Sequence, residues 1–319
     1  MVQKTCKLAR MNTALGLSAL GLAALALASG CTSDPPATPG DGGAAGGGGA
    51  GGGEPLVVGG DRPVTVHVPP GLDPSTPAPL VVLLHGFGAS GLLQEFVFRL
   101  QPLSDERGFL YARPDGTVGE DNRRFWNATD ACCDFGMTGV DDVAYLAGLV
   151  EEIGKHHKVD PKRIYFVGHS NGGFMSHRLA CDRAGMVAAI ASLAGATWND
   201  PAKCAPTEPV AALQIHGTAD DTVLYEGESI NGVGHPGAVD TVEAWAKLDG
   251  CALTPEAGAA MDLDVTISGA ETSVSKYATG CKPGGAAELW TITGAGHLPE
   301  FGAEFAPRLV DWLFAHAKP

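Results

Sequence analysis

The sequence feature that most constrains the fold is the pentapeptide Gly-His-Ser-Asn-Gly at residues 168–172. Residues 164–167 before it are apolar and rich in strand formers, and residues 171–181 after it follow a helical pattern. This order predicts a strand, a sharp turn at Ser170 and a helix, with the serine hydroxyl presented at the carboxyl end of the strand. An ordinary glycine turn with a capping serine is the alternative. We interpret Ser170 as a candidate nucleophile, because the helix N-terminus behind it would favour developing negative charge.

Strands and helices alternate along the remainder of the chain. Helical spacing predicts four helices, the first with Thr138 as its N-cap and the last opened by Pro307. The predicted helices are residues 138–157, 171–181, 239–248 and 307–317. Apolar or alternating runs predict strands at residues 62–68 (an edge strand), 80–84, 109–112, 163–167, 187–193, 210–216 and 288–293. Such alternation predicts an α/β domain in which helices cover both faces of a mostly parallel sheet.

A serine hydroxyl is a weak nucleophile, so it needs a base and an acid that orients the base. Directly after a predicted strand the chain reads His-Gly-Thr-Ala-Asp-Asp, so Asp220 or Asp221 can supply the acid. His297 follows the last predicted strand through Gly-Ala-Gly and is the preferred base. His235, which lies in a glycine-rich loop, is the alternative base.

A reaction that builds negative charge on an oxygen also needs preset N–H donors. In a chain with this order of motifs, one donor is the residue after the nucleophile, here Asn171, and the other lies in the loop after an early strand. That loop reads His-Gly-Phe-Gly from His85 onward, and Phe87 is the expected donor. We interpret His85, His169 and His216 as structural residues.

The start of the chain has the layout of an export signal. Lys4, Lys7 and Arg10 precede an uncharged apolar run at residues 15–28 that ends in small residues. A run this short is typical of a signal peptide rather than a membrane span, and we place the signal at residues 1–30. A buried helix is the alternative.

Cys31 follows small residues, as the modified cysteine of a lipoprotein does, and is the predicted site of lipid attachment. A cysteine kept for a disulfide is the alternative. Residues 31–54 are mostly Gly and Ala and predict a flexible tether, which leaves a catalytic domain at residues 55–319. We therefore expect an exported protein, extracellular or at the cell surface, that is held at a membrane by a lipid anchor only.

Charge and cysteine content narrow the possible partners. The net charge is −15, and loss of the three basic residues of the signal makes the mature form about −18. An acidic surface argues against nucleic acid as a partner. Six cysteines remain after the signal region, which predicts disulfides with 15 possible pairings. Adjacent Cys132 and Cys133 are each expected to pair with a distant partner. The spacing of the six cysteines does not favour zinc, and we predict no metal and no cofactor.

Further motifs run from residue 61 to the C-terminus. They are Leu-Leu-His85-Gly86, Arg-Pro-Asp115-Gly116, Cys132-Cys133, Val140-Asp141-Asp142-Val143, Gly168-His-Ser170-Asn-Gly-Gly173, His216-Gly-Thr-Ala-Asp220 with Val223, and Gly296-His297. Together they resemble the secreted esterases grouped with polyhydroxybutyrate depolymerases and feruloyl or acetylxylan esterases (LpqC-like). The resemblance implies an α/β-hydrolase fold, Asp220 as the acid, and a disulfide between Cys251 and Cys281. We read Asp141 and Asp142 as helix capping and loop bracing.

One departure from that family bears on the substrate. The family usually has Trp-Pro soon after the catalytic histidine, whereas this chain has Leu298-Pro299. Trp126 is then a candidate substrate contact, with a core tryptophan as the alternative. The segment at residues 195–209 is too short for a large lid domain, and an open site suits esters on a polymer or its fragments.

These observations together predict a serine carboxylic-ester hydrolase that acts through an acyl-enzyme. The expected substrates are polysaccharide-linked feruloyl or acetyl esters or polyhydroxyalkanoate oligomers. One alternative is a peptidase on the same scaffold, although such peptidases usually carry an extra gating domain. Another is a catalytically idle surface-binding lipoprotein, against which the intact set of Ser170, Asp220 and His297 argues.

Overall fold

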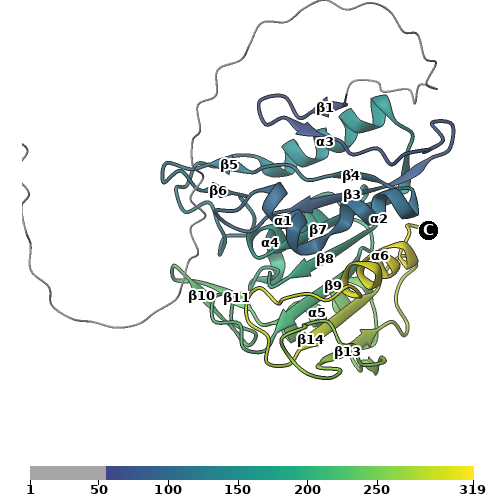
Figure 1. Ribbon diagram of the computed structural model, residues 1–319. Coiled ribbons are helices and arrows are strands. Elements are labelled where there is room, and N and C mark those ends of the chain that lie inside the picture. The colour runs from purple at the N-terminus through teal and green to yellow at the C-terminus, as the bar shows by residue number, and fades with distance from the viewer. Residues whose placement is uncertain (1–54) are drawn as a thin grey trace, which may run out of the picture. The chain divides into compact units, whose positions relative to one another are not determined.

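The computed structural model describes residues 55–319. The predicted signal peptide (1–30), Cys31 and the tether (31–54) lie outside the described residues. The described part is built around an eight-stranded sheet with the order β12-β13-β14-β9-β8-β7-β3-β4 (Figure 1). Neighbours from β14 to β4 run parallel, whereas β12, β13 and β14 pair antiparallel. The strands are β3 Ala78–Leu84, β4 Leu110–Ala112, β7 Val159–His169, β8 Ala189–Leu193, β9 Ala211–Gly217, β12 Glu256–Ala257, β13 Thr272–Tyr277 and β14 Ala287–Ile292.

The central strands are continuous apolar runs because both of their faces are covered. All residues of β3 and β9 are buried. Side chains that alternate along these strands enter two separate core clusters, so that Leu80 and Val82 lie in one and Val81 and Leu83 in the other. The predicted α/β sheet is therefore confirmed, and the carboxyl ends of its parallel strands share one edge.

Helices cover both faces of the sheet, as the sequence predicts. Helices α3, α4 and α5 pack on one face, and α2, α6 and Phe98 at the end of α1 pack on the other. Figure 1 shows α2 beside α6 in front of the strands. None of the helices in the described part combines the length and apolar character that crossing a bilayer requires. The helices are α1 Gly91–Phe98, α2 Leu100–Arg107, α3 Asp142–His156, α4 Asn171–Asp182, α5 Ala238–Asp249, α6 Phe305–Ala315 and the short 3-10 helix Pro201–Lys203.

Two predicted helix starts are wrong by a few residues. Helix α3 begins at Asp142 and is capped by Asp141, whose carboxylate accepts the Ala144 N–H at 2.8 Å. Thr138 cannot serve as the cap, because its hydroxyl and N–H are bound by the carboxylate of Asp134. Helix α6 begins two residues before Pro307, which is still within the first turn, where a missing N–H costs nothing.

The edge strand predicted at residues 62–68 is only partly formed. Within it, β2 (Val64–Thr65) pairs with β1 (Val57–Val58) in a separate two-stranded sheet, and His67 makes a single bridge to Tyr111 of β4. Pro69-Pro70 directly afterwards lack the N–H groups that a longer ladder requires. Two further hairpins were not predicted: β5 (Thr117–Val118) with β6 (Arg124–Phe125), and β10 (Gly227–Ile230) with β11 (Val233–Pro236).

The cysteines form three disulfides within the described residues. Cys251 bonds Cys281, as the family resemblance implied, and Cys181 bonds Cys204. Cys132 bonds its neighbour Cys133, so the expectation of distant partners for these two is wrong. The physical reason is that the fold already pairs the other four cysteines, and both members of this pair are buried together in one core cluster.

Candidate active site

The predicted strand–turn–helix around Ser170 is present between β7 and α4. Ser170 has φ 54° and ψ −120°, a strained backbone that only surrounding structure can hold for a residue with a side chain. A Cβ on Gly168 would overlap the Gly172 carbonyl, and one on Gly172 would overlap the carbonyl of Leu84. The turn therefore requires glycine at both positions, and it sets Ser170 at the carboxyl edge of the sheet.

The structure brings Asp220 and His297 together at the same edge. They follow β9 and β14, which are adjacent parallel strands, and His297 Nδ1 lies 2.8 Å from Asp220 Oδ2. Burial alone would raise the pKa of Asp220, but hydrogen bonds from His216, His297 and two backbone N–H groups hold it well below its usual range. Asp220 therefore stays ionised and can orient the imidazole and stabilise its cationic form.

The two alternative candidates lie elsewhere. Asp221 is exposed, and its carboxylate accepts a hydrogen bond from the Thr222 hydroxyl at 3.2 Å. His235 is buried on β11, where its ring contacts Phe174 edge-to-face and Nδ1 donates to the Pro236 carbonyl at 3.0 Å. Of the candidates for acid and base, Asp220 and His297 are the two that contact each other.

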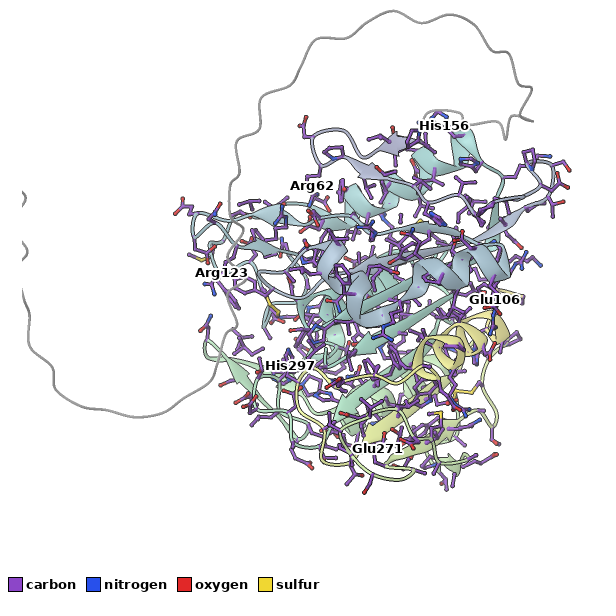
Figure 2. The ribbon with its side chains drawn as sticks, viewed as in Figure 1. Arg62, Glu106, Arg123, His156, Glu271 and His297 are labelled. Carbon is purple, nitrogen blue, oxygen red and sulfur yellow. A yellow bond between two sulfur atoms is a disulfide. The ribbon has the colours of Figure 1, made fainter. Side chains whose placement is uncertain are left out.

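His169 ties the His297 loop to the nucleophile turn. Its Nε2 donates to the His297 carbonyl at 3.1 Å, and the two rings lie 4.8 Å apart. Burial, with a smaller effect of nearby His297, lowers the pKa of His169 to about 3, so this ring is neutral and acts as a donor. Figure 2 shows His297 at this edge of the sheet. Among residues 55–319 no hydrogen bond joins Ser170 Oγ to His297, which is common before a substrate binds.

Of the two expected oxyanion donors, Asn171 follows Ser170 directly in the chain, and Phe87 follows Gly86, which approaches Ser170. Asn171 is the first residue of α4, so its N–H has no acceptor within the helix. Its side chain clamps the backbone of Trp126, accepting its N–H at 2.7 Å and donating to its carbonyl at 2.9 Å. A Cβ on Gly86 would lie 3.4 Å from Ser170 Cβ, so the loop that carries Phe87 passes directly against the nucleophile.

That loop is held by a buried histidine and a carboxylate. His85 Nδ1 donates to the Gly86 carbonyl at 2.7 Å, and His85 Nε2 accepts the Gly116 N–H at 2.9 Å. Burial lowers the pKa of His85, which keeps the ring neutral with one donor and one acceptor nitrogen. Asp115 accepts the Gly91 N–H at the start of α1 at 2.8 Å. These bonds fix the segment in which Phe87 lies.

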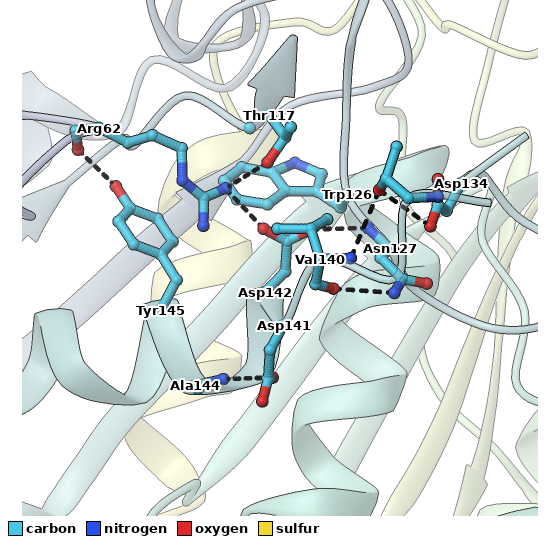
Figure 3. A network of polar contacts seen from close by, with 12 residues as sticks. Arg62, Thr117, Trp126, Asn127, Asp134, Val140, Asp141, Asp142, Ala144 and Tyr145 are labelled. Carbon is cyan, nitrogen blue, oxygen red and sulfur yellow. Dashed lines mark hydrogen bonds and ion pairs between the residues drawn. The ribbon is translucent and has the colours of Figure 1, made fainter. Parts of the chain in front are cut away.

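The structure corrects the expected role of Trp126. Its side chain is fully buried, and the indole N–H donates to the His85 carbonyl at 3.1 Å. The indole therefore supports the Phe87 loop from inside the core and does not line an open surface. Asp142 braces the same segment, because it accepts the Asn127 N–H at 2.7 Å and pairs with Arg62 at 2.5 Å (Figure 3).

A cavity of about 210 Å³ adjoins Phe87, and the sequence did not reveal it. The rings of Phe87 and Phe135 meet edge-to-face with centroids 5.3 Å apart, and the Arg123 guanidinium lies 4.5 Å from the Phe87 ring centre. The lining is completed by Gly119, Glu120, Asp121, Phe125, Cys133, Gly136 and Thr138. The cavity thus combines three phenyl rings with two acidic residues, and Phe87, the expected oxyanion donor, forms part of its wall.

Comparison with known proteins places this geometry in context. The family model described as "Esterase PHB depolymerase" matches residues 63–272. Feruloyl esterase B of Piromyces equi is 31% identical over 244 residues, which cover 74% of this chain and 42% of the relative. The putative esterase NocK of Nocardia uniformis subsp. tsuyamanensis is 30% identical over 210 residues, which cover 62% of this chain and 59% of the relative. The chain therefore spans about half the length of these relatives.

The solved structure of an acetyl xylan esterase from Aspergillus awamori has a TM-score of 0.58 and 15% identity to this chain. The alignment covers 82% of this chain and 99% of that one. At this level of identity the likeness speaks for the fold alone, and it confirms the α/β-hydrolase fold.

Proposed function

This chain belongs to the PHB depolymerase family of esterases, and from that premise we propose that it hydrolyses carboxylic esters through a covalent acyl-enzyme. Ser170 is the nucleophile, His297 the base and Asp220 the acid. The observation that carries the proposal is the 2.8 Å contact between His297 Nδ1 and Asp220 Oδ2, at the edge where the strained turn presents Ser170. In a serine hydrolase, a pair of this kind orients the imidazole that accepts and returns the proton.

In the proposed mechanism, Ser170 Oγ attacks the ester carbonyl carbon while His297 Nε2 takes the hydroxyl proton. The carbonyl oxygen becomes an oxyanion that the N–H groups of Phe87 and Asn171 bind. The tetrahedral intermediate then breaks its bond to the alcohol oxygen, which receives the proton from His297. A water molecule, deprotonated by His297, attacks the carbonyl carbon of the acyl-Ser170 ester. The bond to Ser170 Oγ then breaks, His297 returns the proton to Oγ, and the carboxylic acid leaves. Asp220 remains ionised throughout.

The cavity beside Phe87 supports an aromatic acyl group as the preferred substrate. Its volume of about 210 Å³ is below the roughly 300–1,000 Å³ of pockets that enclose a whole drug-sized ligand, so it suits one end of a substrate. Three phenyl rings, those of Phe87, Phe125 and Phe135, line the cavity, and phenyl rings pack favourably with another ring. Polysaccharide-linked feruloyl esters are therefore the leading substrates, ahead of acetyl esters and hydroxyalkanoate oligomers.

The site of action proposed for this enzyme is outside the cell. Three disulfides within residues 55–319 fit an oxidising compartment and the signal read at residues 1–30. Cys31 carries the proposed lipid anchor. Cells grown with a labelled fatty acid should incorporate label into the wild-type chain and not into Cys31→Ala; equal labelling of both would remove the anchor from the account.

Hydrolysis of short p-nitrophenyl esters by the full chain tests the proposed activity. Wild type should turn over, Ser170→Ala should fall to background, and Ser273→Ala, which alters an exposed serine on β13, should match wild type. The kcat/KM values for methyl ferulate, acetylated xylan and hydroxybutyrate oligomers then rank the substrates, and methyl ferulate should lead. A folded wild type without any hydrolysis would favour the idle binding lipoprotein. Cleavage of peptides but not esters would favour the peptidase.

A further inference from the structure

A chain of buried polar side chains runs from helix α5 to the carboxylate of Asp220. Trp245 Nε1 lies 2.8 Å from His177 Nδ1, and His177 Nε2 lies 3.1 Å from Gln214 Oε1. Gln214 Nε2 lies 3.1 Å from His216 Nδ1, and His216 Nε2 lies 3.1 Å from Asp220 Oδ2. The first four side chains belong to residues that are at most 1% exposed, and the mechanism above uses none of them.

The direction of every hydrogen bond in this chain is fixed from the tryptophan end. An indole nitrogen can only donate, so His177 Nδ1 must accept the Trp245 N–H. Burial lowers the pKa of His177 to about 4, and the neutral ring then carries its single proton on Nε2. His177 therefore donates to Gln214 Oε1, which leaves the amide NH₂ of Gln214 facing His216.

Backbone carbonyls fix the same direction independently. Gln214 Nε2 also lies 2.8 Å from the Gly195 carbonyl, and His216 Nε2 lies 2.8 Å from the Val223 carbonyl. Carbonyl oxygens only accept, so the amide nitrogen and His216 Nε2 must both carry hydrogen. The constraints from the indole and from the two carbonyls agree.

We propose that the hydrogen-bonded series from Trp245 through His177 and Gln214 fixes His216 as the Nε2–H tautomer. His216 is then a positioning residue for the base, His297. The proposal rests on the proposed function. The His216 Nε2–H is shared between the Val223 carbonyl at 2.8 Å and Asp220 Oδ2 at 3.1 Å, and Oδ2 is the oxygen that also accepts the His297 Nδ1–H at 2.8 Å. The other oxygen of Asp220 accepts the backbone N–H groups of Thr222 and Val223, both at 2.9 Å. With donors on both oxygens the carboxylate cannot rotate, and the His297 ring keeps its orientation.

The shared oxygen also makes the orientation of His297 depend on His216. The groups that face Asp220 are His216 and His297, while His169 and Tyr225 lie against these two imidazoles. The second donor on Oδ2 holds the carboxylate in place. Its removal lets the carboxylate turn away from His297 Nδ1, so the imidazole is less often in its reactive orientation and kcat falls.

The tautomer can be measured directly in the wild-type full chain labelled with ¹⁵N-histidine. Long-range ¹H–¹⁵N spectra across the pH range of activity should show Nδ1 of His177 and His216 as unprotonated acceptors and Nε2 of both as protonated. A cationic His216 at neutral pH, or a proton on its Nδ1, would overturn the proposal. This readout does not depend on hydrolysis, so it separates failure of the proposal from failure of the esterase assignment.

Variants test the effect on the base. His216→Phe should lower kcat about tenfold with KM nearly unchanged. His216→Gln retains an N–H donor and should restore part of the lost kcat. Tyr225→Phe keeps the ring against His216 but lies outside the hydrogen-bonded series, and it should leave kcat unchanged. Equal kcat in folded His216→Phe and wild type would refute the proposal. If His216→Phe does not fold, the tautomer measurement decides.

Discussion

The ion pair between Arg62 and Asp142 yields a prediction about the free energy of unfolding. The intact pair should add little to it, whereas removal of either partner alone should lower it strongly. The Asp142 side chain is fully buried, and it accepts the Arg62 guanidinium at 2.5 Å and the Asn127 N–H at 2.7 Å. Burial raises the pKa of Asp142 even against the lowering by Asn127 and Arg62. Desolvation thus outweighs the attraction, and the pair as a whole adds little net stability.

The single substitutions should nevertheless be costly. Asp142→Leu leaves the guanidinium of Arg62, 20% exposed, without its partner, and Arg62→Met leaves a fully buried carboxylate. Breaking a buried pair from one side costs about 3–5 kcal/mol. The double variant Arg62→Met/Asp142→Leu removes both charges and leaves two neutral groups without these partners, the Asn127 N–H and the Thr117 hydroxyl that accepts from Arg62 at 3.1 Å. Leaving such groups unpaired costs about 1–3 kcal/mol. The double variant should therefore be more stable than either single variant.

Urea unfolding of the full chain at pH 7, followed by tryptophan fluorescence, measures these differences. Asp141→Ala provides a matched neighbour, because it removes only the exposed N-cap of α3 and should cost about 1 kcal/mol. The reasoning is refuted if the double variant loses as much as the two singles together. It also fails if Asp141→Ala costs more than Asp142→Leu.

Three further predictions concern titration, the nucleophile turn and the choice of acid. Burial raises the pKa of Asp249 to about 7 from 3.8, so the stability linked to its protonation, roughly 4 kcal/mol, is present below about pH 4 and lost as the pH rises through 7. Thermal melts of Asp249→Asn should lack that slope, and a slope equal to that of wild type would contradict the assignment. Gly172→Ala should abolish ester hydrolysis, because the added Cβ overlaps the Leu84 carbonyl. Gly148→Ala, in open space on α3, should keep activity and raise the free energy of unfolding by up to about 1 kcal/mol. Asp220→Asn should lower kcat about 10⁴-fold and should also lower the melting temperature, because it replaces an oxygen that accepts hydrogen bonds with an NH₂ group. Asp221→Asn should leave kcat and the melting temperature unchanged, and the reverse order for kcat would exchange their roles.

The sequence predicted the parts of the structure that follow from periodic burial and from turn chemistry. Buried strands such as β3 read as continuous apolar runs, and the glycines around Ser170 mark a turn that no other residue fits. The order of serine, acid and histidine then favoured His297 as the base and left Asp220 or Asp221 as the acid, and the family resemblance favoured Asp220. Parallel strands bring their carboxyl ends to one edge, which is why residues so far apart in the sequence can meet.

The remaining features depend on contacts between segments that lie far apart in the chain. Nothing local shows that Trp126 is buried beneath the His85 carbonyl, 41 residues away. Composition cannot show that Cys132 bonds Cys133 while the other four cysteines of residues 55–319 bond one another. Likewise, Trp245 and His177 are 68 residues apart, so the polar chain that ends at Asp220 becomes visible only in the fold.

The most direct test of the central claim is covalent labelling of the nucleophile. The full chain is treated with a phosphonate ester that reacts with activated serines, and intact mass and peptide mapping locate the adduct. The account predicts one phosphonyl group per chain on Ser170, no labelling of Ser170→Ala, and much slower labelling of His297→Gln. Labelling of another residue at a comparable rate, or a folded wild type that remains unlabelled, would contradict it.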